Sequence, residues 1–181
     1  KKVNVKSEII NTPKEVLQAK KLILPGVGHF KQGMKNLNEL NLIDPIIHKV
    51  MTEKTPILGI CLGMQLLTKK SEEGDVNGLG LINATTIGFS IENNIKIPHM
   101  GWNEITVMKK NPLFNENEPQ RFYFVHSFFV DCKNESDILT TTFYGKKFCS
   151  GFSNGNIFGF QFHPEKSHKY GFSLMEKFAH I

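Results

Sequence analysis

The sequence predicts a mixed α/β fold, in which a central, mostly parallel sheet is flanked by helices and extended by an antiparallel β region. In about the first 70 residues, short apolar runs alternate with segments of helical periodicity, which is typical of βαβ units with parallel strands. From Gly78 onward, short runs rich in Phe, Thr and Ile are separated by turn residues, as in antiparallel sheets. Because the chain contains no internal repeat and no linker, we expect residues 1–181 to form a single domain.

Local signals place the first elements. Residues 1–10, KKVNVKSEII, resemble a strand. Residues 12–15, TPKE, form a capping box with proline at the first helical position, which predicts a short helix over 13–19. The apolar run KLIL predicts a buried strand over 21–24, and the glycine-rich stretch PGVGHF at 25–30 predicts the loop that follows it.

The next elements continue the alternation. Apolar residues at helical spacing predict a helix over 30–40 and a second one over 44–52, which is opened by an Asp-Pro pair. The run PILGI predicts another short buried strand over 56–60, and residues 62–70 again have helical spacing. Strand, helix and strand in this order favour a parallel sheet covered by helices.

The C-terminal third contains a hairpin and a helix. The pair Asn154-Gly155 predicts a hairpin turn between strands over 148–153 and 157–162. An amphipathic pattern predicts a last helix over 168–179.

Composition and charge exclude several classes of function. The net charge of +5 comes from lysines in scattered pairs and a single arginine, Arg121, without interleaved aromatic residues, so we expect no nucleic-acid binding. No apolar run approaches the roughly 18 residues of a membrane span, and the N-terminus lacks the apolar segment of a signal peptide. We therefore expect no membrane association and a cytoplasmic location. Three scattered cysteines without a CxxC pair predict free thiols, no metal site and no cofactor.

One of these cysteines, Cys61, lies in the stretch GICLGMQL directly after a predicted strand and before a predicted helix. The pattern G-x-C-x-G in that context is typical of a nucleophile elbow, because the two glycines allow a sharp turn and leave the sulfur uncrowded. A helix N-terminus favours negative charge, so we expect it to stabilise the thiolate. A buried structural cysteine is the alternative, and this segment alone does not decide between the two.

The stretch QFHPE near the C-terminus supplies a candidate base. If the strand from Ile157 continues through it, His163 and Glu165 lie two residues apart on one face, about 7 Å from each other. A carboxylate there accepts the second N–H of the imidazole and fixes its tautomer, which is the arrangement of a nucleophile, base and acid triad. Taken alone, His163 is better explained as a structural histidine at a strand end.

The loop PGVGHF is a candidate oxyanion hole. It follows a buried strand whose end, in a parallel sheet, lies at the same edge as Cys61. The amides of Val27 or Gly28, with the N–H of Leu62, are then available to a tetrahedral oxyanion, and one such donor is typically worth about 2.7 to 4 kcal/mol. A simple glycine turn and a phosphate-binding loop are the alternatives, although no P-loop lysine follows.

Taken together, the motifs PGVGHF, GICLGMQLL, PHMGWN, FVHSF and FHPEKS resemble, in order and spacing, the class I (triad) glutamine amidotransferases. Within that family they are most similar to the glutaminase subunits of imidazole glycerol phosphate synthases. The resemblance covers nearly the whole chain. It implies a flavodoxin-like fold, here apparently lacking the usual N-terminal strand and helix of the family, which would leave an unpaired sheet edge.

The resemblance also implies roles for individual residues. Cys61 would attack the side-chain amide of glutamine and release ammonia, His163 would move the protons, and Glu165 would orient His163. The residues that match the family's glutamine-binding positions are Gln65, Glu73, Ser127 and Phe128. The residues in the block that faces the partner in the family are His99, Met100 and Trp102; a core tryptophan is the alternative for Trp102.

A partner is implied by the chemistry of ammonia, which is mostly protonated in neutral water. Family members pass it to a barrel-shaped synthase (cyclase) subunit in a heterodimer, which serves histidine biosynthesis. His168 and Tyr170 resemble a sister group that supplies ammonia for acetamidino sugars of the bacterial surface, so the acceptor stays open. A non-catalytic scaffold subunit and another Cys-His hydrolase, such as a peptidase, are further alternatives.

Overall fold

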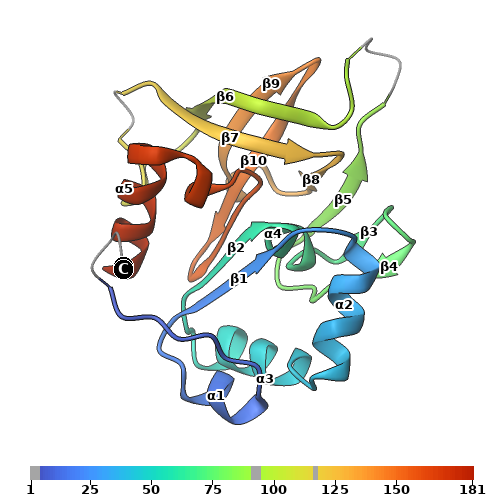
Figure 1. Ribbon diagram of the computed structural model, residues 1–181, viewed down its shortest axis with the longest axis vertical. Helices are drawn as coiled ribbons and strands as arrows, with labels where there is room; N and C mark the ends of the chain where they lie inside the picture. Colours follow the sequence, from blue (N-terminus) through green and yellow to red (C-terminus); the bar gives the residue numbers. More distant parts are fainter. Residues whose placement is uncertain (1–4, 91–94, 116–117) are drawn as a thin grey trace.

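A computed structural model describes residues 5–90, 95–115 and 118–181. Figure 1 shows two regions, an α/β region around strands β1 and β2 and an antiparallel region that contains β6, β7, β9 and β10. One sheet path joins them in the order β1-β2-β11-β10-β8-β5-β3-β4. The mixed α/β architecture predicted from the sequence is confirmed.

The α/β region is built on three parallel strands, β1 (Leu22–Gly26), β2 (Ile57–Cys61) and β11 (Ile157–Phe160). Gly26 pairs with Cys61 across β1 and β2, and Phe160 pairs with Ile60 across β11 and β2. Because the strands are parallel and in register, all three end at the same edge of the sheet, and the loops that leave this edge converge.

Helices cover both faces of these strands (Figure 1). Their bounds are α1 (Pro13–Gln18), α2 (Phe30–Glu39), α3 (Ile43–Ile47), the π-helical turn η1 (His48–Thr52) and α5 (His168–Ala179). The predicted capping box of α1 is present, since Glu15 N–H donates to the Thr12 hydroxyl and the Glu15 carboxylate accepts from Thr12 N–H. The helix predicted over 44–52 is present as α3 and η1, and its π-helical end was not predicted.

The segment predicted as a helix over 62–70 is shorter than expected. Helix α4 (Leu62–Leu66) ends after five residues, and the chain then enters β3 (Lys70–Ser71). The Thr68 hydroxyl donates to the carbonyl of Gln65, and Lys69 N–H donates to the carbonyl of Ala84. The sheet therefore takes over the backbone groups that a longer helix would have used.

The antiparallel region contains most of the remaining strands. They are β4 (Val76–Asn77), β5 (Ala84–Gly88), β6 (His99–Val107), β7 (Gln120–His126), β8 (Phe128–Cys132), β9 (Ile138–Tyr144) and β10 (Lys146–Asn154), with a 3-10 turn η3 (Glu135–Asp137). The hairpin of β10 and β11 pairs Asn154 with Ile157, so its turn residues are Gly155 and Asn156, one position later than predicted. Gly155 has a φ of 57°, which glycine adopts without strain.

Two predictions near the ends of the chain are wrong. Strand β11 ends at Phe160, and residues 164–166 form the 3-10 turn η4 (Pro164–Lys166), so His163 and Glu165 are not two residues of one strand. Residues 5–10 form no strand, and the other part of that predicted strand, residues 1–4, lies outside the described residues.

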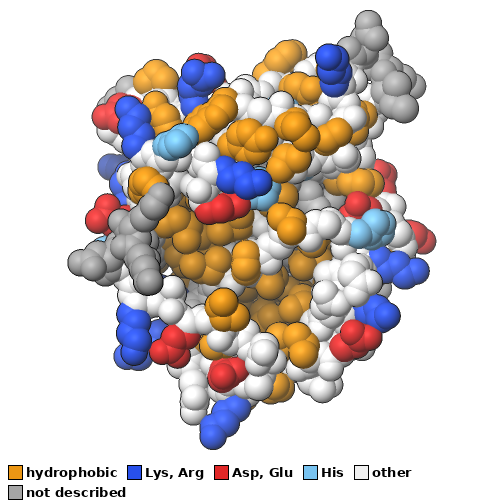
Figure 2. Space-filling view, viewed as in Figure 1, with side chains coloured by type: hydrophobic (Ala, Val, Ile, Leu, Met, Phe, Trp, Pro, Cys, Tyr) orange, Lys and Arg blue, Asp and Glu red, His pale blue; other side chains and the backbone are white. Residues whose placement is uncertain are grey.

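Two hydrophobic clusters meet at the parallel strands. Ile57 and Ile157 face the cluster formed with α1, α2 and α3, whereas Leu58 and Phe158 face the cluster that includes Phe178 of α5. An apolar hollow of about 670 Å³ lies beside β1, between α5 and residues 5–10, and Figure 2 shows hydrophobic side chains gathered there. No helix among the described residues is long and apolar enough to cross a membrane.

Candidate active site

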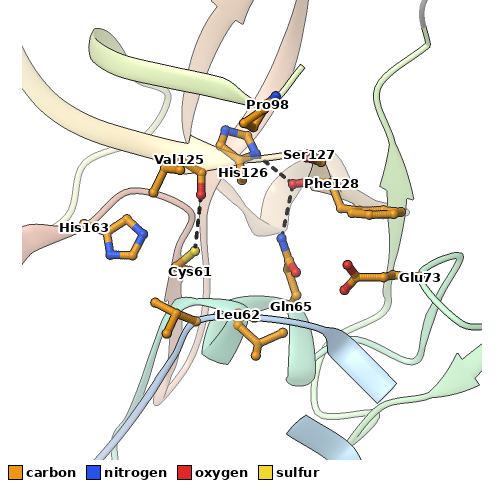
Figure 3. A pocket seen from close by; sticks show the side chains of 12 residues that line it. Cys61, Leu62, Gln65, Glu73, Pro98, Val125, His126, Ser127, Phe128 and His163 are labelled. Carbon is orange, nitrogen blue, oxygen red and sulfur yellow. Dashed lines mark hydrogen bonds between the residues drawn. The ribbon is translucent and has the colours of Figure 1, made fainter. Parts of the chain in front are cut away.

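A cavity of about 310 Å³ opens where the three parallel strands end. Its lining residues are Val27, Gly28, Cys61, Leu62, Gln65, Glu73, Pro98, Val125, His126, Ser127, Phe128 and His163. Figure 3 shows His163, Cys61, Gln65 and Glu73 in that order across the cavity. The structure therefore brings together in one cavity every predicted catalytic, oxyanion and substrate residue except Glu165, which reaches the cavity through its contact with His163.

The backbone at Cys61 has the strained geometry of an elbow. Its φ of 53° and ψ of −110° are unusual for a residue with a side chain, and Cys61 directly joins β2 to α4. Gly63 permits this sharp turn, because a Cβ there would lie 1.7 Å from the carbonyl oxygen of Leu24 on β1. The predicted strand, turn and helix around the cysteine are confirmed.

The expected thiolate is not the resting form of Cys61. The pKa of the thiol is raised to about 11, mainly by burial and also by the charge of Glu165. Hydrogen bonds from Leu62 N–H and from the Gln161 side chain act in the opposite direction. Because α4 has only five residues and the sulfur is shielded from water, desolvation outweighs the effect of the helix terminus. Cys61 rests as a neutral thiol, and its S–H donates to Val125 O at 3.9 Å.

His163 is oriented by Glu165. Its Nδ1 donates to Glu165 Oε1 at 2.7 Å, and the contact is made across the η4 turn, where the sequence predicted a strand. With a proton on Nδ1 facing the carboxylate, Nε2 is the nitrogen that carries the lone pair whenever the ring is neutral. That atom is buried and has no hydrogen-bond partner among the described residues, and the ring lies beside Cys61 in Figure 3. The backbone of His163 is held on both sides, because its amide N–H donates to Tyr123 O and its carbonyl accepts from the Ser167 hydroxyl.

The glycine-rich loop and the start of α4 line the same cavity as the sulfur of Cys61. Gly28 has a φ of 104°, a conformation that glycine adopts and larger residues avoid. Leu62 N–H forms a hydrogen bond to the Cys61 sulfur. With Val27 and Gly28 lining the same cavity, amide groups of both segments border the space next to the sulfur.

Gln65 and Glu73 border the far end of the cavity. Gln65 Nε2 donates to Phe128 O at 3.1 Å and to Gln161 Oε1 at 2.9 Å, so both of its N–H groups are used and its Oε1 remains an acceptor. Glu73 Oε2 accepts from Phe30 N–H, the first residue of α2, at 2.6 Å. Two acceptors, Gln65 Oε1 and the Glu73 carboxylate, therefore border this end of the cavity, which suits a bound ammonium group.

Ser127 and Phe128 join β7 to β8 at the roof of the cavity. Phe128 O accepts from His126 Nδ1 at 2.7 Å as well as from Gln65, as the dashed lines in Figure 3 show. His126 Nε2 in turn faces His99 Nδ1 at 2.9 Å. Burial lowers the pKa of His126 to about 3 and that of His99 to about 4, so both imidazoles are neutral.

The predicted interface residues divide into two groups. Met100 is 61% exposed and Trp102 is 40% exposed, so both are available to a partner. Trp102 stacks on His168 with a centroid distance of 5.6 Å. His99 is only 2% exposed and stacks on Tyr144, so its place in a contact surface was predicted wrongly. Alternate residues of β6 point to opposite faces, which separates His99 and Met100.

Three residues near the sulfur were not predicted: Val125, His126 and Gln161. Gln161 follows β11 as Cys61 ends β2, and the parallel register Phe160 to Ile60 places it beside the cysteine. That register could have been expected from the two predicted strands. Val125 and His126 come from the antiparallel region, where strand order cannot be read from local patterns. No cluster of metal-ligating side chains occurs among the described residues.

Comparisons with known proteins identify the family of the chain. A family model described as glutamine amidotransferase class-I matches residues 1–180. The chain is 56% identical to imidazole glycerol phosphate synthase subunit HisH 2 of Methanococcus maripaludis over 178 residues, which cover 98% of this chain and 88% of that protein. It is 43% identical to HisH 2 of Pseudomonas aeruginosa and 47% identical to HisH 1 of Campylobacter jejuni, covering 90% of each.

Solved structures share the fold at low sequence identity. A crystal structure of a glutamine amidotransferase has a TM-score of 0.74 at 17% identity, covering 97% of this chain and 88% of that one. The glutaminase domain of Trypanosoma brucei CTPS with bound acivicin has a TM-score of 0.63 at 15% identity, covering 93% and 74%.

Proposed function

The chain belongs to the class I glutamine amidotransferases, and from this premise we propose that it is the glutaminase subunit of an imidazole glycerol phosphate synthase. Residues 1–181 act as one glutaminase domain, which hydrolyses glutamine and delivers ammonia to a synthase partner in histidine biosynthesis. Relatives of that name at 43% to 56% identity support the assignment. The observation that carries the chemistry is the buried, unpartnered Nε2 of His163 in the same cavity as the Cys61 thiol.

The first half of the reaction forms a thioester. His163 Nε2 accepts the Sγ proton as Sγ of Cys61 bonds to the amide carbon of glutamine, and the carbonyl oxygen becomes an oxyanion. The imidazolium then gives its proton to the departing nitrogen, so ammonia leaves and the thioester remains. Because burial raises the pKa of the thiol to about 11, the attack needs His163 to take the Sγ proton.

The second half releases glutamate. Water adds to the thioester carbon while His163 takes its proton, the C–S bond breaks, and the sulfur recovers the proton from the imidazolium. Glu165 keeps the proton of the neutral ring on Nδ1 and stabilises the imidazolium in both halves. The amides of Leu62 and of Val27 or Gly28 serve the oxyanion of each tetrahedral intermediate.

The order of residues across the cavity suits the two ends of a glutamine molecule. With its side-chain amide at Cys61, its amino-acid end reaches the region of Gln65 and Glu73 (Figure 3). Gln65 Oε1 and the Glu73 carboxylate are acceptors for the α-ammonium group, and the backbone at Ser127 and Phe128 is assigned to the carboxylate. A glutamine lacking its α-ammonium group would lose these contacts.

The synthase partner is assigned to the exposed face of β6. Met100 and Trp102 are large apolar side chains on that face, in the antiparallel region whose other residues roof the cavity. Aromatic side chains of this kind dominate the binding energy of many protein interfaces. A barrel-shaped synthase docked there receives ammonia close to where it is released.

The experiment is glutamate release from glutamine, measured with the chain alone, with the cyclase of histidine biosynthesis, and with an acetamidino-sugar synthase. We expect turnover mainly with the cyclase, abolished by Cys61→Ala and unchanged by the matched control Cys132→Ala. Turnover only with the sugar synthase would keep Cys61 as nucleophile and replace the acceptor. Full turnover by Cys61→Ala, or stimulation of the cyclase without glutamine, would contradict the catalytic role.

A further inference from the structure

Gln161 is a buried polar side chain whose position is set by the parallel sheet. It is 0% exposed and follows β11, whose last residue Phe160 pairs with Ile60. The next residues along the two strands, Gln161 and Cys61, therefore lie side by side at the edge of the cavity. Gln161 Nε2 is 3.6 Å from Cys61 Sγ, and Gln161 N–H donates to Ser150 O.

The orientation of the Gln161 amide follows from its neighbours. Phe128 O can only accept, so the group of Gln65 that faces it must be the NH₂ group. The second N–H of Gln65 points to the Gln161 side chain, which must then present its oxygen there, at 2.9 Å. The NH₂ group of Gln161 is left to face the sulfur.

Two further residues hold this arrangement in place. His126 Nδ1 donates to the same Phe128 O at 2.7 Å, so the carbonyl has two donors. His126 Nε2 must then accept, and His99 Nδ1 donates to it at 2.9 Å. The direction of every hydrogen bond from His99 to Cys61 is thereby fixed, and a flipped Gln161 amide would leave two donors, the NH₂ groups of Gln65 and Gln161, facing each other.

We infer that Gln161 is a further catalytic residue, whose side-chain amide donates a hydrogen bond to the Cys61 sulfur and stabilises its thiolate form. This inference rests on the proposed function, in which Cys61 is the nucleophile. In the buried site few donors replace water around the sulfur. Leu62 N–H is the other hydrogen-bond donor that lowers the pKa of the Cys61 thiol. A donor to a charged sulfur in such a site is worth more than one exposed to solvent.

The test is the rate of Cys61 alkylation by iodoacetamide as a function of pH, followed by peptide mass spectrometry. Gln161→Met keeps the approximate size of the side chain and removes the donor. We expect its alkylation rate below pH 9 to fall about 10- to 100-fold, with the pH profile displaced upward, because a hydrogen bond to a charged group is lost. Glutamine hydrolysis should fall by a similar factor. Gln32→Met, on the exposed face of α2, is the matched control.

Gln161→Glu is the second variant, because it keeps an acceptor for Gln65 and the size of the native side chain. It replaces the donor with a negative charge beside the sulfur, so its alkylation should be slower than that of Gln161→Met. An unchanged pH profile and unchanged hydrolysis in either folded variant would overturn the inference. A displaced profile in a protein that never hydrolyses glutamine would preserve the role of Gln161 at the sulfur and contradict the proposed function.

Discussion

The two hydrophobic clusters that meet at the parallel strands differ in composition, and the two halves of the catalytic machinery are positioned by different means. The cluster around α1 to α3 is mainly aliphatic, with Phe30 and Phe152 as its buried phenylalanines. The other cluster contains ten, namely Phe89, Phe114, Phe122, Phe124, Phe129, Phe148, Phe158, Phe160, Phe162 and Phe178. Cys61 is fixed by a strained backbone between glycines, whereas His163 follows directly on a stack of aromatic rings.

The difference matters because the site lies where the regions meet. Backbone geometry leaves no tolerance for an added atom near Cys61, since Gly63 touches the Leu24 carbonyl. In the aromatic cluster the packing is shared among several rings. The ring centroids of Phe122 and Phe162 are 4.0 Å apart, and those of Phe162 and Phe160 are 5.1 Å apart. A substitution at the close backbone contacts near Cys61 should therefore abolish folding, whereas a substitution among the stacked rings should lower stability and activity only in part.

The largest effect is expected from Gly63→Ala. Its Cβ would lie 1.7 Å from Leu24 O, a backbone atom of β1, so α4 and β1 cannot keep their positions. We expect more than about 4 kcal/mol of lost stability, measured by urea unfolding, or no folded protein at all. Gly88→Ala is the control, because its Cβ would meet Phe128 at an ordinary 3.6 Å. Equal stability of the two variants would break the comparison.

Next in size is Phe122→Ala in the aromatic cluster. Phe122 is fully buried, so we expect a loss of about 3 to 5 kcal/mol in the free energy of unfolding. The variant should still fold, with glutaminase turnover reduced through a less firmly held His163. Leu67→Ala, equally buried in the aliphatic cluster, should lose about 2 to 5 kcal/mol without that loss of turnover. Turnover unchanged in Phe122→Ala would contradict the role of ring packing.

Glu165→Gln should leave the fold intact and slow the chemistry. The amide cannot stabilise the imidazolium as the carboxylate does at 2.7 Å, so we expect about a 10²-fold lower kcat with stability almost unchanged. Steady-state glutamate release and a thermal melt separate the two quantities. Glu39→Gln, on the exposed end of α2, is the control. A kcat within twofold of the native value would mean that Glu165 does not orient His163.

The smallest effect concerns pH. Because burial raises the pKa of Cys61 to about 11, the thiol stays protonated at neutral pH and its thiolate fraction grows with pH up to that value. The rate of Cys61 alkylation by iodoacetamide should rise about tenfold per pH unit between pH 7 and 9, which corresponds to about 1.4 kcal/mol per unit. A plateau below pH 8 would indicate a preformed thiolate and imidazolium pair.

Much of the α/β region was predictable because its signals are local. The capping box predicted the start of α1, and the Asp-Pro pair predicted the start of α3 to within one residue. The pattern G-x-C-x-G predicted the elbow at Cys61. The pKa of Cys61 was not predictable, because burial by β7 and β11 depends on tertiary packing. The same reason explains the short α4, whose end is decided by hydrogen bonds to β5.

After β11, the motif FHPE identified His163 and Glu165 but not the turn that joins them. Proline after His163 favours departure from the strand, and the 3-10 turn brings the carboxylate to the ring more closely than a strand would. His99 was misplaced because its block was read as a surface, while alternation along β6 turns His99 inward and leaves Met100 exposed. Contacts between distant strands, such as that of His126 with His99, have no local signal.

The most direct measurement is the site of modification by a chloroketone analogue of glutamine, mapped by peptide mass spectrometry. The carbon that bears chloride resides where the reacting amide would lie, so Cys61 Sγ should displace chloride and form a single adduct. Excess glutamine should prevent it, and Cys132 should remain unmodified. An adduct on Cys132 or none on Cys61, in protein shown to be folded, would contradict a glutamine site at the junction of the two regions.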